Sequence, residues 1–453
     1  MARTVDMTVG NPAKLIMRFA VPLIITNLGQ QFYMMVDAAI VGRGVGVHAL
    51  AAVGSADWTY WLILWSVTAL AQGFSIFVSR YFGEQNYEEM NKTIATSTIL
   101  CAVIGGLLTL IGILFARPVL ELLDTPQEII GDATVYLVTM IAGTLVVTAY
   151  NMASSILRAF GDGKSPLVGM AIAATLNVGL DLLFVMVFQW GVFGAAFASV
   201  IAQGISFLYC LWQINKVSCV RLEKSMWGLD FKRMGSLLKF GLPLSAQFMV
   251  IALSGIILQS TINLQGSYFV AGYTALNKMY GFLESSAISL GTAFSTYFAQ
   301  NYGAGNYKRV LSGVRTGIYL TIGLSLVVMV IMLLGGKTLL LMFLDVSKEG
   351  GVEALAVAWK YLRYMSYCLV ILYVIYVYRN VLPAMGVSIW SMIGGVVEGA
   401  IRVGMGKFLV PLWGTEVFYY IEPFAWLGAF ALVIIPYYCI RKKYLIDKEA
   451  AAE

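Results

Sequence analysis

The chain carries little charge for its length. Only 12% of its 453 residues are Asp, Glu, Lys or Arg, whereas soluble globular domains have about 25%. Hydrophobic residues make up 59% of the chain, and the mean hydropathy is +0.80. This composition excludes an ordinary soluble domain. It predicts an all-α polytopic membrane protein, because a helix satisfies its own backbone hydrogen bonds in lipid.

Residue types that bind metals or act as catalytic bases are also scarce. The single histidine, His48, lies in a glycine-rich segment and cannot form a zinc site unaided. The cysteines are odd in number, scattered and without a CxxC pair: Cys101, Cys210, Cys219, Cys368 and Cys439. We therefore expect no disulfide framework, no metal centre, no cofactor and no enzymatic activity.

The balance of charge does not indicate a nucleic-acid partner. The net charge is +6, but the lysines and arginines cluster near the ends of apolar runs, where membrane orientation already explains them. The polar N-terminus, MARTVDMTVGNP, lacks the apolar core and cleavage site of a signal peptide. The first apolar run is therefore expected to remain as the first span.

Twelve apolar runs are long enough to cross a bilayer as helices, which takes about 20 residues each. They cover residues 15–42, 50–79, 93–115, 129–157, 166–188, 192–214, 237–264, 269–298, 312–334, 355–382, 387–412 and 417–440. With both termini cytoplasmic, 21 of the 30 cations are assigned to the cytoplasmic side, Arg379 near the end of the tenth run among them, and 7 to the other side, leaving Lys278 and Arg402 within spans. This bias fits the positive-inside rule and predicts a multi-pass protein of the plasma (inner) membrane.

The sequence contains an internal repeat. FAVP at 19–22 recurs as FGLP at 240–243, and YFGEQNY at 81–87 recurs as NYGAGNY at 301–307, with nearly the same separation between the two motifs. Six spans per half return the chain to its starting side, so the halves have parallel orientation. We predict two pseudo-symmetric six-helix bundles, an N-lobe at 1–215 and a C-lobe at 240–453, joined by a cytoplasmic linker at 216–239.

The linker is the longest and most basic connection. Met226 and Trp227 lie beside Lys224, Lys232 and Arg233, a pattern typical of a helix on an anionic membrane surface. A plain solvated linker fits the composition equally well.

One acid lies within the first span. A carboxylate at membrane depth costs at least about 2.5–3.5 kcal/mol, so Asp37 indicates a partner or a task. Asn27, Gln30 and Tyr33 share a broad helical stripe with it and are candidates to line a cavity. Met34 is a further candidate, since methionine suits adaptable surfaces. The alternative is a helix-packing Asp held by neutral partners.

A second acid lies in the fifth span. Asn177 and Asp181 are four residues apart and share one helical face. If Asp37 and Asp181 meet at one dry site, desolvation and repulsion favour a shared proton or cation. The alternative is two unrelated buried acids on different faces.

The C-terminal half has a different set of charges. Glu398 and Arg402 are spaced for a structural ion pair within one helix. Lys278 and Glu284 are six residues apart in the eighth span and do not share a face; either one is a candidate to line a cavity. Asp57 and Glu422 lie near span ends and are weaker candidates.

Several segments together resemble the multidrug and toxin extrusion (MATE) family. They are GNPAKLIMRFAVPLIITNLGQQFYMMVDAAIVGR near the start, RYFGEQNY, SSILRAFGDGKSP, TLNVGLDLLF and FAQNYGAGNYKR. The resemblance covers nearly the whole chain. It implies twelve helices in two bundles around a central cavity, and export of organic cations and other drugs in exchange for protons or sodium ions.

The resemblance also implies a cation site in the N-lobe. Asp37 matches the family's first-helix acid, Asn177 and Asp181 match the fifth-helix pair, and Tyr136 and Ser199 match neighbouring hydroxyl positions. A sodium ion would be held by Asp37, Asn177 and Asp181. Other members use acids in the seventh and tenth helices, which the corresponding runs of this chain lack, so the coupling hypothesis centres on the N-lobe.

We therefore expect a monomeric antiporter that works by alternating access on a cationic, partly apolar small molecule. A lipid or lipid-linked oligosaccharide flippase of the same superfamily is the nearest alternative, although it would require several cations to bind a pyrophosphate. A membrane-embedded transferase and a passive channel are more distant alternatives.

Overall fold

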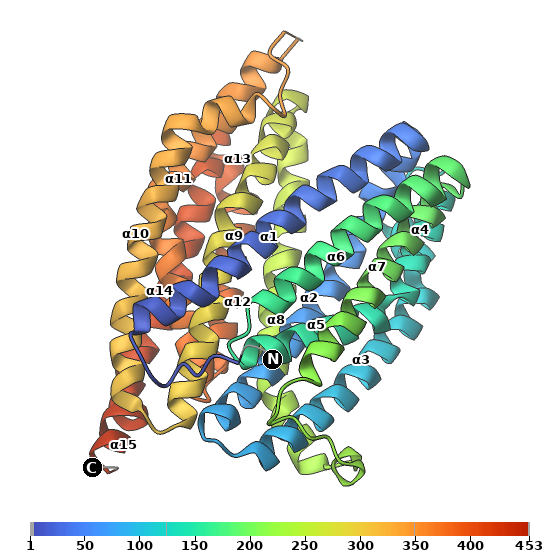
Figure 1. The fold of residues 1–453 in the computed structure, drawn as a ribbon. Coiled ribbons are helices and arrows are strands. Elements are labelled where there is room, and N and C mark those ends of the chain that lie inside the picture. Colours follow the sequence, from blue (N-terminus) through green and yellow to red (C-terminus); the bar gives the residue numbers. More distant parts are fainter. Residues whose placement is uncertain (1–3, 124, 348, 452–453) are drawn as a thin grey trace. The chain divides into compact units, whose positions relative to one another are not determined.

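The computed structural model describes residues 4–123, 125–347 and 349–451, and this part of the chain is helical with no strand. Figure 1 follows the helices in chain order. The first half contains α1 (Pro12–Gly44), α2 (Val47–Gly83), α3 (Tyr87–Leu122), α4 (Ile130–Ala142), α5 (Thr144–Ala159), α6 (Lys164–Asp181) and α7 (Gly191–Ile214). The second half contains α8 (Phe231–Ile262), α9 (Ser267–Gly303), α10 (Tyr307–Leu340), α11 (Gly351–Ala384), α12 (Ile389–Gly404), α13 (Val410–Trp413), α14 (Phe418–Arg441) and α15 (Asp447–Ala450).

The twelve predicted runs all coincide with helical segments. Nine helices in the described residues are long and apolar enough to cross a membrane, and α4 with α5 forms a further span that bends by 45°. The bend lies at Gly143, where the side chain of Val200 leaves no room for a Cβ atom. The two remaining runs correspond to α9, which is more polar, and to α12, which continues through a π-helical turn at Met405–Leu409 into α13.

The chain divides into two compact units. Unit 1 holds Val21–Ser245 together with the described residues before Thr8, and unit 2 holds Thr8–Ala20 and Ala246–Glu453. The boundary lies inside α8 because the first half of that helix packs on α2. A Cβ atom placed at Gly73 would lie 3.0 Å from the Cα of Gly241, and the rings of Phe77 and Phe240 meet edge to face at 5.0 Å.

The internal repeat corresponds to the same turn in each unit. After α2 the backbone reaches a positive φ of 59° at Gln85, and the N–H of Asn86 donates to the carbonyl of Tyr81 at 3.0 Å. After α9 the φ of Gly305 is 73°, and the N–H of Asn306 donates to the carbonyl of Asn301 at 2.9 Å. Each turn is a C-terminal cap of the Schellman type.

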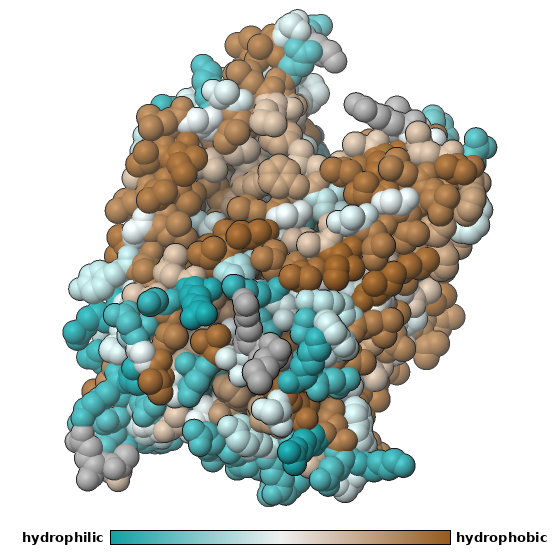
Figure 2. Space-filling view, in the orientation of Figure 1, coloured by the Kyte–Doolittle hydropathy of each residue, from teal (hydrophilic) through white to brown (hydrophobic). Residues whose placement is uncertain are grey.

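The helix flanks are apolar where no other helix covers them. On α3 the side chains of Leu107, Leu110 and Leu114 are all exposed and follow one face at helical spacing. Figure 2 shows hydrophobic residues over the flanks, whereas hydrophilic residues gather at the lower end of each unit, around the α2–α3 turn in unit 1 and α15 in unit 2. This distribution is that of helices whose flanks contact lipid.

Candidate cation site

The site lies in unit 1, where α1 packs against α6. Asp37 lies two turns before the end of α1, and Asp181 is the last residue of α6 before a π-helical turn at Leu182–Val187. Glycines bring the helices together on both sides of Asp37. A Cβ atom at Gly29 would lie 2.8 Å from the Cε of Met170, and one at Gly44 would lie 2.9 Å from a methyl group of Val185.

The two carboxyl groups meet at this contact. The side chains of Asp37 and Asp181 are within hydrogen-bonding reach of each other. Two carboxylates this close repel each other, and a proton or a cation between them would remove the repulsion. The structure therefore places both predicted acids at one position and excludes the alternative of acids on unrelated faces.

A chain of hydrogen bonds orients Asp181. One orientation of the Asn177 side-chain amide gives hydrogen-bond partners to both its nitrogen and its oxygen. In this orientation the Nδ2 of Asn177 donates to the Oδ2 of Asp181 at 2.8 Å. The Oδ1 of Asn177 then accepts from the backbone N–H of Ser199 at 3.1 Å and from its Oγ at 3.0 Å. The hydroxyl of Tyr33 lies 3.2 Å from the Oγ of Ser199, on α7. This chain of hydrogen bonds contacts the Oδ2 of Asp181 and leaves its Oδ1 without a contact from Asn177.

Each of the two carboxyl groups has one oxygen, Oδ1, that is buried and makes no hydrogen bond to the described part of the chain. The Oδ1 atoms of Asp37 and Asp181 have no hydrogen-bond partner among the described residues. Asp181, Asn177 and Ser199 are buried, and Asp37 is half-buried. An unpaired buried acceptor costs roughly 1–3 kcal/mol, more for a charged group. One unpaired oxygen from each carboxyl is the arrangement that a shared proton or small cation would satisfy.

The ligand types point to a hard cation. The two carboxyl groups supply the oxygens of the pair, and the groups described next to them are the amide of Asn177 and the hydroxyls of Ser199 and Tyr33. In the residues that the structure describes, no group of three or more His, Cys, Asp or Glu side chains is arranged to hold a metal ion. The oxygens suit a proton or an alkali ion rather than a transition metal.

Tyr136, the neighbouring hydroxyl that the resemblance implies, lies beside the site. Its hydroxyl is directed to the Oδ1 of Asp57, at 3.5 Å, rather than to the Asn177–Ser199 chain. Tyr136 remains within electrostatic reach of Asp37 and Tyr33. Asp57 thus borders the site, although the sequence made it a weak candidate. The reason is that α2 begins at Val47, so Asp57 lies almost three turns inside the helix.

The candidate cavity-lining residues are divided between the two units. Asn27, Gln30 and Met34 are half-buried on α1 in unit 1. In unit 2, Lys278 is exposed, whereas Glu284 is half-buried and accepts a hydrogen bond from the hydroxyl of Tyr376 at 3.1 Å. Lys278 and Glu284 therefore have different environments, as their six-residue spacing predicts.

Unit 2 contains a buried network of ion pairs. Arg402 contacts Glu398 at 2.9 Å, the predicted spacing, and also binds Glu422 through two nitrogens, with the shorter distance at 2.7 Å. Glu398 binds Arg379 at 2.7 Å. All four side chains are buried.

Two of these partners correct the sequence analysis. Arg379 was counted as a cytoplasmic cation and Glu422 was a weak candidate, yet both are buried partners in this network. Removing one cation from the cytoplasmic count leaves the charge bias in place. The two arginines and two glutamates neutralise each other, which is what a structural network requires in a low-dielectric interior.

A comparison with models of protein families identifies the family of this chain. The family model MatE matches the chain twice, over residues 22–183 and 243–402, so its two matches begin at the two prolines of the internal repeat. The chain belongs to the MatE family. The family consists of transporters, and the chain is accordingly a membrane transporter and not an enzyme.

Curated relatives agree with this assignment. The chain is 31% identical over 310 residues to the probable multidrug resistance protein YpnP of Bacillus subtilis, covering 67% of this chain and 68% of the relative. It is 20% identical over 440 residues to the multidrug export protein MepA of Staphylococcus saprophyticus, covering 96% of each.

Solved structures show the fold. A crystal structure of MATE in the bent conformation has a TM-score of 0.89 at 20% identity and covers 100% of this chain and 99% of its own. A MOP superfamily transporter from Pyrococcus furiosus, described as having a binding pocket of reverse polarity, also has a TM-score of 0.89 at 20% identity, covering 98% of each chain. The predicted fold class, twelve transmembrane helices in two bundles, is therefore confirmed for this MatE protein.

Proposed function

We propose that this MatE protein is a secondary active antiporter that exports small organic molecules in exchange for a proton, by alternating access. The carboxyl pair Asp37–Asp181 is the observation that supports this proposal. In this pair two intramembrane acids share a contact, with one buried, unsatisfied oxygen on each. The names of the curated relatives, multidrug resistance and export proteins, support a drug-like or metabolite cargo.

The proposed cycle uses the charge of this pair. With the site open to the outside, a proton enters between the two carboxyl groups and removes the repulsion between them. The α1–α6 contact tightens, and a bound cationic, partly apolar molecule is released. The proton leaves toward the cytoplasm, and the deprotonated pair then favours binding of the next cationic substrate.

A proton fits this geometry better than a sodium ion. Two carboxyl oxygens are enough to share one proton, whereas a sodium ion needs a larger shell of oxygens. Asn177 and Ser199 are engaged with each other, and the amide nitrogen of Asn177 points at Asp181. A sodium ion would have to displace that donor. We therefore propose the proton as the coupling ion and Asn177, Ser199 and Tyr33 as the groups that position Asp181.

The proposal also includes the location, orientation and oligomeric state of the protein. We propose a plasma-membrane location, both termini in the cytoplasm and a monomeric transporter. Because one proton is exchanged for one cationic molecule, the pH difference across the membrane drives transport, and each pH unit supplies about 1.36 kcal/mol.

The test is transport in proteoliposomes with separately imposed gradients. An inward proton gradient should drive substrate movement in the opposite direction, and a sodium gradient without a proton gradient should not. Asp37→Asn should insert and fold but lose this coupled transport, whereas Asp132→Asn, an exposed acid in the first turn of α4, should retain it. Equal transport by Asp37→Asn and the unmodified protein would contradict the proposal. Transport driven by sodium alone would replace the proton with sodium.

Proteoliposomes also allow the flippase alternative to be distinguished from the antiporter. Arg379 and Arg402 are each bound by buried glutamates in unit 2, so their charge is already neutralised. Translocation of a fluorescent anionic lipid without any ion gradient would support the flippase; its absence together with proton-driven drug transport would support the antiporter.

A further inference from the structure

The segment between α7 and α8 differs from the surface helix that its composition suggests. Only Lys224–Trp227 forms a helical turn, of 3-10 type, and α8 already begins at Phe231. Asp230 starts α8: its Oδ1 accepts from the backbone N–H of Arg233 at 2.9 Å. This N–H and the Arg233 side chain hold the pKa of Asp230 below its ordinary value, so the cap stays charged at neutral pH.

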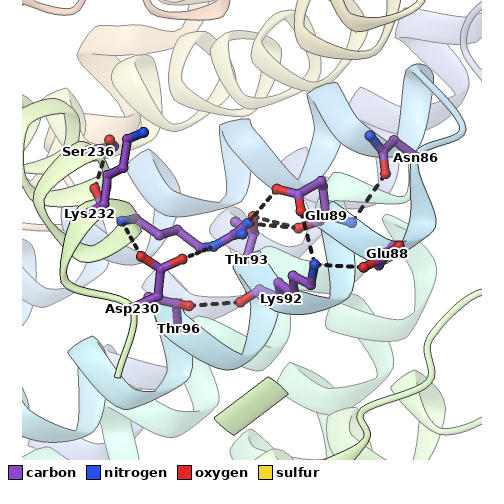
Figure 3. A network of polar contacts seen from close by, with 10 residues as sticks. Asn86, Glu88, Glu89, Lys92, Thr93, Thr96, Asp230, Lys232 and Ser236 are labelled. Atoms are coloured by element: carbon purple, nitrogen blue, oxygen red, sulfur yellow. Dashed lines mark hydrogen bonds and ion pairs between the residues drawn. The ribbon is translucent and has the colours of Figure 1, made fainter. Parts of the chain in front are cut away.

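Two polar anchors hold this segment on the first turns of α3. The amide of Asn91 donates to the carbonyl of Cys219 at 3.0 Å and accepts from the N–H of Arg221 at 3.2 Å. At the other end, the guanidinium of Arg233 binds the carboxylate of Glu89 at 2.9 Å. Figure 3 shows Asp230 at the start of α8 and Glu89 and Thr93 on α3, all three of which the side chain of Arg233 contacts.

Between the anchors the segment exposes large apolar side chains. Trp227 is 42% exposed, Leu229 61% and Phe231 76%. Such a group in water is costly, at about 25 cal/mol per Å² of apolar surface. The inner side of the segment borders a cavity of about 990 Å³, whose lining includes Met226 and Leu229 as well as charged residues of both signs. Trp227 and Phe231 do not line this cavity.

Cations accompany these apolar residues. Arg221, Lys224 and Lys232 are all exposed. We define Arg221, Lys224, Trp227, Leu229, Phe231 and Lys232 as the linker face. Aromatic and apolar residues mixed with lysine and arginine are the composition of a segment that lies at an anionic lipid interface.

The length of α8 places the linker face at the depth of the lipid headgroups. The 32 residues of α8 rise about 48 Å at 1.5 Å per residue. A bilayer with its headgroups is about 40–45 Å thick. Phe231, at the first position of α8, therefore falls at headgroup level when the helix spans the membrane. The preceding helix, α7, ends near the exposed Trp212, an aromatic residue of the kind found at membrane interfaces.

We propose that the linker face is a membrane-surface anchor that binds the anionic phospholipid headgroups of the leaflet next to it. Its three cations contact the headgroups, and Trp227, Leu229 and Phe231 enter the boundary between headgroups and acyl chains. Because Asn91 and Arg233 fix both ends of the segment to α3, the anchor sets the height of α3 and of the start of α8 relative to the bilayer. The linker face thus couples unit 1 to lipid charge.

The first test uses the unmodified protein. In nanodiscs made of equal parts phosphatidylglycerol and phosphatidylcholine, backbone hydrogen exchange over residues 222–231 should be slower than in discs of phosphatidylcholine alone. Exchange over the exposed end of α15 should be the same in both discs. Equal exchange over residues 222–231 in the two lipids would overturn the proposal.

The second test measures depth directly. In a variant whose five cysteines are replaced by serine or alanine, Leu229→Cys carries a nitroxide label, and its accessibility to oxygen and to a water-soluble nickel complex is measured in both discs. In anionic discs the label should be accessible to oxygen and shielded from nickel. Each removed lysine should weaken the association about fivefold, so Lys224→Gln with Lys232→Gln should return the label to water.

A matched pair removes two exposed lysines elsewhere, Lys337→Gln with Lys407→Gln, and should leave the label in place. A label that is open to nickel in anionic discs would overturn the proposal. So would a label shielded from both reagents in detergent, because that result indicates packing against protein.

Discussion

The carboxyl pair allows one substitution to be worked through quantitatively. Asp181→Asn keeps the size and shape of the side chain. Its amide oxygen still accepts from Asn177, whose nitrogen lies 2.8 Å away in the native structure. Its amide nitrogen replaces the other carboxyl oxygen and is expected to donate to Asp37, whose carboxyl lies within hydrogen-bonding reach of residue 181. The variant therefore imitates the protonated pair permanently, and it should fold and insert normally.

The size of the substrate gradient that the protein can sustain follows from the number of protons that the site can hold. One unsatisfied oxygen on each carboxyl provides for one shared proton per cycle. Exchange of one proton for one monovalent cation moves no net charge, so only the pH difference drives it. Each pH unit supplies about 1.36 kcal/mol, which sustains about a tenfold substrate gradient. Asp181→Asn should reduce that gradient to about one, because the pair no longer releases a proton.

The assay is the steady-state substrate ratio across proteoliposome membranes as the imposed pH difference is increased. The logarithm of the ratio should rise by one per pH unit in the native protein and stay flat in Asp181→Asn. Asp132→Asn, on the surface of α4, should follow the native slope. A native slope in Asp181→Asn would refute the assignment of the pair, and a native slope of two would show a second proton site.

Other predictions concern the surroundings of the pair and the network of unit 2. Asp57→Asn should slow proton-driven transport without changing the steady-state ratio, because Asp57 borders the site through Tyr136 and is not one of the paired carboxyls; a changed ratio would contradict this. Arg402→Met leaves Glu398 and Glu422 buried without their shared partner, so thermal unfolding in detergent should show a loss of about 3–5 kcal/mol. Arg117→Met, which removes an exposed pair, should cost less than about 1 kcal/mol; a similar loss in both variants would refute the network's role.

Much of the structure of this protein can be predicted from its sequence alone. The twelve spans follow from apolar runs, because a helix that crosses lipid needs about 20 such residues whatever its neighbours are. The shared face of Asn177 and Asp181, and the spacing of Glu398 and Arg402, follow from 3.6 residues per turn. The repeated turns before Asn86 and Asn306 follow from local backbone geometry. Each of these properties depends on residues close together in sequence.

The contacts between helices were decided by the tertiary structure alone. Asp37 meets Asp181 where α1 contacts α6 and the π-helical turn after it, with Gly29 against Met170 and Gly44 against Val185, and neither helix specifies these contacts by itself. Arg379 was read as a cytoplasmic charge because its partner, Glu398, lies on another helix. Periodicity along one helix fixes which residues share a face. Which faces meet depends on side-chain packing between distant segments, and that packing is what placed the two carboxyls together.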